Sequence, residues 1–207
     1  MRTVYVIPHA EATHHVDGLV GGWLDTPLTQ HGQLQAQAAA TAIQNLVAEP
    51  TSVYASDLTR AVQTAQPIVD ALGSELITTP DLREIGCGIA EGKPQAWLDA
   101  RIAPPPQDAS RLDHVIIEGA ETRRSIAQRI NRFVEHLTLD EVPNGVVVTH
   151  GFAASFVLAA WIGMPANAMG LVSFDVSAGG ITRLDWDPQW GNRQITTLDD
   201  TTHLADI

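Results

Sequence analysis

The chain has 207 residues, 44% of them hydrophobic and 17% charged, which is typical of one globular domain over residues 1–207 and excludes extended disorder. Its 12 Lys+Arg against 24 Asp+Glu give a formal net charge of -12, the wrong sign for a protein that binds nucleic acid or lies on an anionic membrane. Cys87 is the only cysteine, which excludes a disulfide framework, a Cys-rich zinc site and an iron–sulfur cluster within one chain.

The first part of the chain alternates short apolar runs with helical periodicities. Pro8 ends a β-branched run that reads as a buried strand, and Thr29 is a suitable N-cap for the first helix. Gly73 closes the next helix, in which Pro67 should introduce a kink or shorten it. In chain order the patterns predict a strand at 3–7, a helix from Thr29 to about Val47, a strand at 52–55, and a helix capped by Ser56 or Asp57 that ends at Leu72.

The second part is irregular before the alternation returns. Residues 80–120 show no regular pattern, and Pro104–Pro106 form a stiff loop segment. The strand–helix alternation over the whole chain predicts an α/β sheet with helices on both faces. The elements predicted after residue 120 are a helix from Thr122 to about Leu137, a strand at 145–149, a helix at 152–162, strands at about 171–177, 181–186 and 193–197, and a turn over 188–192.

The sequence contains no signal for a membrane or for export. The longest apolar stretch, from Phe152 to Pro165, is too short to span a bilayer. Residues 1–9 lack the apolar core and cleavage site of a secretory signal. We expect a cytoplasmic protein with no membrane or nucleic-acid partner, and a homodimer is left open.

Three side chains fall where open α/β sheets bind ligands, outside the carboxyl ends of the strands. His9 follows the first strand, His150 ends the strand at 145–149, and Arg60 lies in the first turn of a helix. Gly151 and a helix follow His150, so backbone N–H groups at a helix N-terminus face the same crevice and favour an anion. Two imidazoles, a guanidinium and free N–H groups predict a site for a tetrahedral anion.

The blocks around these residues resemble the histidine phosphatase superfamily, also called the phosphoglycerate mutase-like family. Pro8-His9-Ala10-Glu11-Ala12 stands where that family has Arg-His-Gly-Glu-Thr, and Thr149-His150-Gly151 matches its second histidine block. The resemblance covers the whole chain in order, and several blocks in register are far more specific than one. The other similar blocks are Gly22–Gly32, Ser56–Ala65, Leu82–Gly86 with Glu91-Gly92, Gly119–Thr122 with Arg129, and His203-Leu204.

The resemblance implies a three-layer sandwich with a mostly parallel central sheet, and a role for each matched residue. His9 would be the nucleophile that forms a phosphohistidine. Arg60, His150 and the N–H groups near Gly151 would surround the phosphoryl oxygens, and Gly22 would lie in the substrate site. Glu84, which competes with Asp81 and Glu91, would protonate the leaving oxygen. The scheme needs no metal and no cofactor.

The site departs from the family pattern beside the nucleophile. Pro8 replaces the family arginine and offers neither a guanidinium nor a backbone N–H. Ala10 replaces the family glycine. His15, with His14 beside it, stands where the family places a phosphate-contacting asparagine or its equivalent. We expect His14 and His15 to bind substrate and to replace the missing donor.

The leading function is a metal-independent phosphatase that hydrolyses a small phosphate monoester through phospho-His9. One alternative is a family member that the loss of arginine at Pro8 leaves catalytically weak, or that binds a phosphorylated or carboxylated small molecule without turnover. Another is a non-phosphatase reaction in the same pocket. A mutase is less favoured, because the cap or insert at about 92–120 looks short for a substrate-capping insertion. A metal site built from His9, His14, His15 and His150 is the least favoured alternative.

Overall fold

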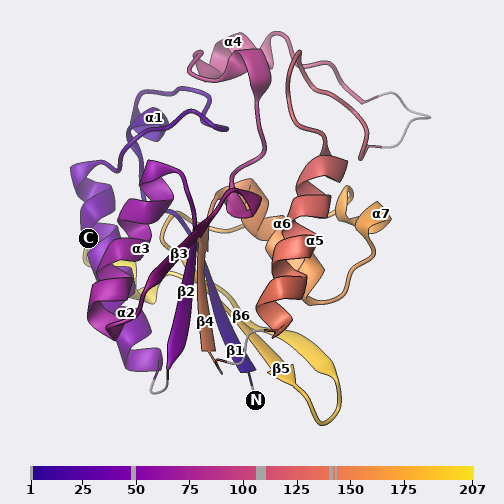
Figure 1. The fold of residues 1–207 in the computed structure, drawn as a ribbon. Helices are drawn as coiled ribbons and strands as arrows, with labels where there is room; N and C mark the ends of the chain where they lie inside the picture. Colours follow the sequence, from indigo (N-terminus) through magenta and orange to yellow (C-terminus); the bar gives the residue numbers. More distant parts are fainter. Residues whose placement is uncertain (1, 48–49, 106–110, 140–141, 143) are drawn as a thin grey trace.

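Two layers of helices enclose a six-stranded sheet in the order β3-β2-β4-β1-β5-β6 (Figure 1). The computed structural model describes residues 2–47, 50–105, 111–139, 142 and 144–207. Strands β3, β2, β4 and β1 run parallel, whereas β5 is antiparallel to both of its neighbours. These features confirm the predicted three-layer α/β class. The strands are β1 (Arg2–Pro8), β2 (Thr51–Ser56), β3 (Leu76–Thr79), β4 (Asn144–Thr149), β5 (Ile181–Asp187) and β6 (Asn192–Asp200).

The helices cover both faces of the sheet, with α2 and α3 on one side and α5 and α6 on the other (Figure 1). Within the described ranges no helix is long and apolar enough to cross a membrane. The α-helices are α1 (Thr13–Val16), α2 (Gln30–Leu46), α3 (Thr59–Leu72), α4 (Gln95–Asp99), α5 (Arg123–Leu139), α6 (Gly151–Trp161) and α7 (Ala166–Met169), and short 3-10 helices lie at Pro80–Leu82, Gly88–Ala90 and Thr202–Leu204.

Two apolar cores form because successive residues of a strand point to opposite faces of the sheet. Val4 and Val6 of β1 pack with α5 and α6, whereas Tyr5 and Ile7 pack with α2 and α3. Each fully buried aliphatic side chain contributes about 1.5–3 kcal/mol relative to an exposed one, so both faces of a central strand must be apolar. This constraint explains the continuous apolar runs that marked β1 and β4 in the sequence.

Two of the three helix caps predicted from the sequence are present in the structure. The Oγ1 of Thr29 accepts the Gly32 N–H at the start of α2, and Gly73 closes α3 in the left-handed region at φ 62°. The predicted capping of α3 by Ser56 or Asp57 is wrong. Asp25, from a distant loop, instead accepts the N–H and hydroxyl of Thr59 in the first turn of α3.

Pro67 lies inside α3 without shortening it, because the helix continues unbroken to Leu72. The buried residues on either side of the proline hold the helix on the sheet, since Ala65 and Ile68 belong to the core beneath it. Packing therefore outweighs the lost hydrogen bond at this position.

The predicted strand at 171–177 is wrong, since residues 171–176 form an irregular segment across α6. Val172, Phe174 and Val176 pack against the core with the two-residue spacing of a strand. The hydroxyl of Ser155 holds this segment, because it accepts the Phe174 N–H and donates to the Phe174 carbonyl. Apolar alternation thus arises here from packing on a helix and not from pairing in the sheet.

The end of this segment, residues 176–180, is fixed by polar contacts to the sheet. The Asp199 carboxylate accepts the N–H and the hydroxyl of Ser177, at 2.8 and 2.7 Å. The Gly179 N–H donates to the Pro8 carbonyl, at the end of β1. These bonds set the position of the loop beside the carboxyl end of the sheet.

The segment 80–120 is mostly irregular, as predicted, and contains only short helices in its described part. Edge strand β3, just before it, was missed because two of its four residues are exposed and carry no alternating signal. Pro106, part of the predicted stiff loop, lies outside the described residues.

Candidate active site

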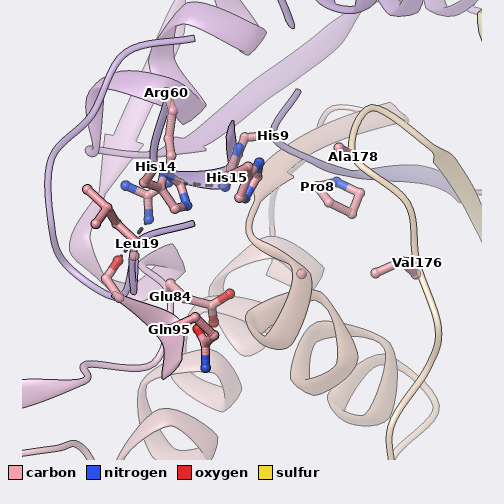
Figure 2. Close-up of a pocket in the computed structure, with 13 residues that line it drawn as sticks. Pro8, His9, His14, His15, Leu19, Arg60, Glu84, Gln95, Val176 and Ala178 are labelled. Carbon is pink, nitrogen blue, oxygen red and sulfur yellow. Dashed lines mark hydrogen bonds between the residues drawn. The ribbon is translucent and has the colours of Figure 1, made fainter. Parts of the chain in front are cut away.

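A cavity of about 320 Å³ opens at the carboxyl ends of β1 and β4, where the sequence predicted an anion site (Figure 2). His150 lies directly beside it, with its ring centroid 5.0 Å from that of His9. The structure therefore brings the predicted site residues together. Those that line the cavity are His9, His14, His15, Gly22, Arg60, Glu84 and Gly151.

His9 is held with one ring nitrogen turned toward Arg60 and the cavity. Its Nδ1 lies 2.7 Å from the Ala10 carbonyl oxygen, which only accepts hydrogen bonds, so Nδ1 carries the proton. The Nε2 atom accepts the Nε–H of Arg60 at 3.1 Å, as its lone pair requires. Burial, followed by the charge of Arg60, holds the pKa of His9 well below 6.5. His9 is therefore a neutral imidazole, the form that attacks an electrophile.

The Arg60 guanidinium is buried and fixed by three different acceptors. Besides His9 Nε2, it donates to the carbonyl oxygens of Leu24 and Gly22, at 2.7 and 2.8 Å. Burial lowers the pKa of Arg60, while Glu84 and other nearby carboxylates oppose that shift, and an arginine remains charged in a protein. It places a fixed positive charge beside the nucleophile candidate.

Glu84 occupies the N-terminus of α6. Its Oε2 accepts the Phe152 N–H at 3.0 Å, and its Oε1 accepts the N–H groups of Ile85 and Ala153. The expectation that free N–H groups near Gly151 receive the anion is therefore wrong for Phe152 and Ala153, because Glu84 already satisfies them. Gly151, the first residue of α6, keeps an N–H without a partner inside the helix and lines the cavity.

The environment of Glu84 makes its carboxyl group easier to protonate than a free one. Burial raises the pKa of Glu84, and the N–H donors and Arg60 offset this rise only in part. Asp81 and Glu91, which competed with Glu84 in the sequence, are used elsewhere. Asp81 pairs with Arg132, and Glu91 accepts the N–H groups of Trp23 and Cys87.

His14 and His15, on the short helix α1, lie against the nucleophile candidate (Figure 2). The His15 ring stacks on that of His9 at 5.3 Å and 12°, and the His14 ring lies 6.0 Å from it. Burial, with His15 and Arg60 as further causes, lowers the pKa of His14 to about 3. Burial and Arg60 also lower the pKa of His15. Both rings are therefore neutral near pH 7 when no anion is bound.

His150 is fully buried, and neither ring nitrogen has a hydrogen-bond partner among the residues described. Burial, followed by His9, holds the pKa of His150 well below 6.5. Buried polar atoms are normally satisfied, so these nitrogens indicate a missing partner. A ligand oxygen in the adjoining cavity would supply one.

Sequence reasoning missed several residues that shape the cavity. Leu19, Gln95, Val176 and Ala178 line it, but none belongs to a catalytic residue type. Thr26 contacts His14 Nδ1 through its hydroxyl at 2.7 Å, and no local pattern indicated that contact. Such residues become visible only when distant loops are placed together.

The mostly parallel sheet carries a neutral histidine and a buried arginine at its carboxyl edge, an arrangement suited to a tetrahedral anion. A model of the histidine phosphatase superfamily (branch 1) matches residues 4–200. The chain therefore belongs to the histidine phosphatase superfamily, whose members act on small phosphorylated substrates.

Some of the similar proteins are named as phosphatases and others as mutases. A Proteus mirabilis protein called probable phosphoglycerate mutase GpmB is 32% identical, and the match covers 100% of this chain and 97% of the relative. The alpha-ribazole phosphatase from Shigella flexneri is 28% identical with a TM-score of 0.79, over 96% of each chain. A mycobacterial glucosyl-3-phosphoglycerate phosphatase, 24% identical with a TM-score of 0.81 over 97% of this chain and 100% of its own, shows the same fold. The protein is thus an enzyme of a family that holds phosphatases and mutases.

A buried ion pair holds the loop that carries Glu84. Arg129 of α5 donates to the carbonyl oxygens of Asp81, Arg83 and Glu84, at 2.8, 2.6 and 2.9 Å. It also pairs with Glu121, and each of the two side chains is 8% exposed. One guanidinium therefore sets the path of the backbone on which the candidate acid stands.

We predict that Arg129→Met lowers the free energy of unfolding by about 3–5 kcal/mol, because it leaves the Glu121 carboxylate buried without its partner. Urea unfolding followed by circular dichroism measures the change. Arg124→Met is the matched control, since Arg124 lies on the same helix in an exposed pair with Asp113 and its loss should change stability little. Equal losses in the two variants would contradict a structural role for the buried pair.

Proposed function

We propose that the protein is a metal-independent phosphatase that hydrolyses a small phosphate monoester through a phosphohistidine at His9. The observation that carries the proposal is the Nε2 atom of His9, whose lone pair is fixed by the Nδ1–H bond to Ala10 and lies beside Arg60. A neutral imidazole attacks phosphorus, and the guanidinium stabilises charge on the phosphoryl oxygens.

The reaction has two steps in this proposal. The Nε2 lone pair of His9 forms a bond to phosphorus while the bond from phosphorus to the leaving oxygen breaks, and Glu84 gives its proton to that oxygen. The Glu84 carboxylate then takes a proton from water, which attacks phosphorus and releases inorganic phosphate and His9. The raised pKa of Glu84 supports its role as acid in the first step.

The remaining site residues hold the phosphoryl group. We assign this role to Arg60, His150, the Gly151 N–H, His14 and His15, with Gly22 at the edge of the substrate site. His150 has unpartnered ring nitrogens that an oxygen of the substrate would satisfy. This scheme uses no metal and no cofactor.

Residues 92–120 act as a short cap in this proposal. Val20 donates to the Lys93 carbonyl and Gln95 donates to the Gly18 carbonyl, so the start of the cap is joined to the loop after α1. Gln95 from the cap reaches the cavity, and α4 lies beyond the carboxyl end of the sheet (Figure 1).

A mutase is the second candidate, because the Proteus mirabilis relative carries that name. Phosphoglycerate has a carboxylate as well as a phosphate, and a mutase site must hold both. Among the described residues that line the cavity, Arg60 is the only arginine or lysine. One guanidinium beside the nucleophile favours a substrate with a single anionic group, and hence the phosphatase.

The test is the activity of wild type and His9→Ala on a panel of phosphate monoesters, with and without EDTA. We expect activity that EDTA does not remove, an acid-labile phosphoenzyme in wild type, and loss of both in His9→Ala while circular dichroism shows that the variant is folded. His31→Ala, on exposed α2 surface, is the control and should behave as wild type. Retention of most activity in His9→Ala would exclude the phosphohistidine route, and phosphate transfer between phosphoglycerate positions would favour the mutase.

Glu84→Gln should slow alkyl phosphates far more than aryl phosphates. An alkoxide leaves poorly without a proton, whereas a nitrophenolate needs little help, so the general acid matters only for the first substrate. Rates on one alkyl and one aryl phosphate measure the difference. Equal losses on both substrates would remove Glu84 from the role of acid.

Pro8→Arg should leave turnover unchanged or lower it, because His14 and His15 already lie beside His9. A bound phosphoryl dianion raises the pKa of His15, whereas His9 stays neutral, so turnover should rise as the pH falls toward about 6.5. The measurement is a pH–rate profile of wild type, Pro8→Arg and His15→Ala on one aryl phosphate. A flat profile that His15→Ala does not alter would show that His14 and His15 do not take over the role of the family arginine. A large gain in Pro8→Arg would show the same.

A further inference from the structure

His9, His14 and His15 bring three ligand nitrogens within 4.8 Å of one another. We propose that this triad binds one divalent transition-metal ion of the zinc or copper class and that the ion inhibits the enzyme. The inhibition rests on the proposed phosphatase, whereas the binding of the ion does not.

Two of the rings are already oriented as metal ligands. A ligating histidine usually donates its other ring N–H to a carbonyl or another acceptor, which fixes the tautomer and aims the lone pair. His9 Nδ1 donates to the Ala10 carbonyl, and His14 Nδ1 contacts the Thr26 hydroxyl at 2.7 Å. When Thr26 accepts, the Nε2 atoms of both rings present lone pairs.

The Thr26 hydroxyl can either donate to His14 Nδ1 or accept from it, and this sets whether His14 Nε2 carries a proton or a lone pair. If Thr26 donates to Nδ1, the proton of His14 sits on Nε2 and faces a phosphoryl oxygen. If Thr26 accepts, Nε2 holds a lone pair and faces a cation. The same ring therefore serves an anion or a metal ion according to which one arrives.

His15 completes the triad from the solvent side. Its Nδ1 accepts the Ala12 N–H at 3.3 Å, a longer contact than those of the other two rings, so this nitrogen is the least committed. The His14 and His15 ring centroids are 4.1 Å apart. His15 is exposed, which leaves an open side for entry of the ion.

The space around His14 Nε2 is kept free by Gly21. A Cβ atom at position 21 would lie 2.7 Å from that nitrogen and 2.9 Å from Cδ2 of the same ring. Any side chain there would force the ring or the loop to move.

The chemistry of the donors selects the ion. Three neutral imidazoles suit zinc and copper, whereas calcium and magnesium require mostly oxygen ligands.

The positive charge of Arg60 repels a metal ion, but it does not prevent the ion from binding. The metal takes the place of one Arg60 N–H at His9 Nε2, and the guanidinium keeps the carbonyls of Leu24 and Gly22. Glu84, Asp25 and Glu91 supply negative charge around Arg60. Once its Nε2 lone pair is bound to the ion, His9 no longer attacks phosphorus, and inhibition follows.

The experiment titrates metal-free protein with Zn²⁺ against a chromophoric chelator. We expect one ion per chain in wild type, with Thr26→Val weakening binding by about 10–100-fold because the hydroxyl that orients His14 is lost. His14→Gln and His15→Ala should weaken binding further, since each removes a ligand. His31→Ala is the control, and its affinity should equal that of wild type. Binding that His14→Gln and His15→Ala leave unchanged would overturn the site.

The second arm measures aryl phosphate hydrolysis at increasing Zn²⁺, with EDTA added at the end. Inhibition that follows the binding curve, is shifted to higher Zn²⁺ in Thr26→Val and is reversed by EDTA supports the proposal. Activation by Zn²⁺ would overturn the inhibitory role. Triad-dependent binding by a protein with no hydrolytic activity would sustain the metal site and reject the phosphatase.

Discussion

The buried guanidinium of Arg60 is the constraint on which the site depends. A charge that is 1% exposed is costly unless its N–H groups find acceptors, and the loop at residues 21–25 supplies two carbonyl oxygens. His9 supplies the third acceptor, so the same charge folds the loop and turns the nucleophile candidate. Burial is the main cause of the lowered pKa values of His9, His14 and His15, and the charge of Arg60 lowers them further. Local folding and site chemistry therefore have a common origin.

Much of the fold was predictable because burial on both faces leaves a strong signal. β1 and β4 are continuous apolar runs, and Thr29 and Gly73 mark helix ends by local chemistry. Predictions failed where the cause is tertiary. Asp25 caps α3 from another loop, and the alternation at 171–177 reflects packing on α6.

The site was predictable to a similar degree. Parallel strands place their carboxyl ends at one edge, so His9, His150 and Arg60 had to meet there. The occupant of the α6 N-terminus was not predictable, because Glu84 comes from a loop 68 residues before Phe152 in the chain. The role of Thr26 was likewise invisible, since it depends on which ring its hydroxyl meets.

The neutral histidines of this pocket present nitrogen lone pairs that different groups could bind. In the proposed scheme a proton, a phosphoryl group and a metal ion would compete for the Nε2 lone pair of His9. Burial disfavours the proton, and the positive charge of Arg60 would favour a phosphoryl group over a metal ion. Which group binds His9 Nε2 most readily would thus depend on solvent access and charge around that atom, and not on the imidazole alone.

In the loop at 176–180, the groups that anchor the loop differ from the residues that line the cavity. Ser177 is bound to Asp199 and the Gly179 N–H to the Pro8 carbonyl, whereas Val176 and Ala178 line the cavity. Asp199 belongs to the edge strand β6 and does not line the cavity, so this anchor is provided by the sheet. Changes at Val176 and Ala178 would therefore alter the lining of the cavity while the bonds that anchor the loop remain. This part of the cavity wall could therefore change in shape without any change in His9, Arg60 or Glu84.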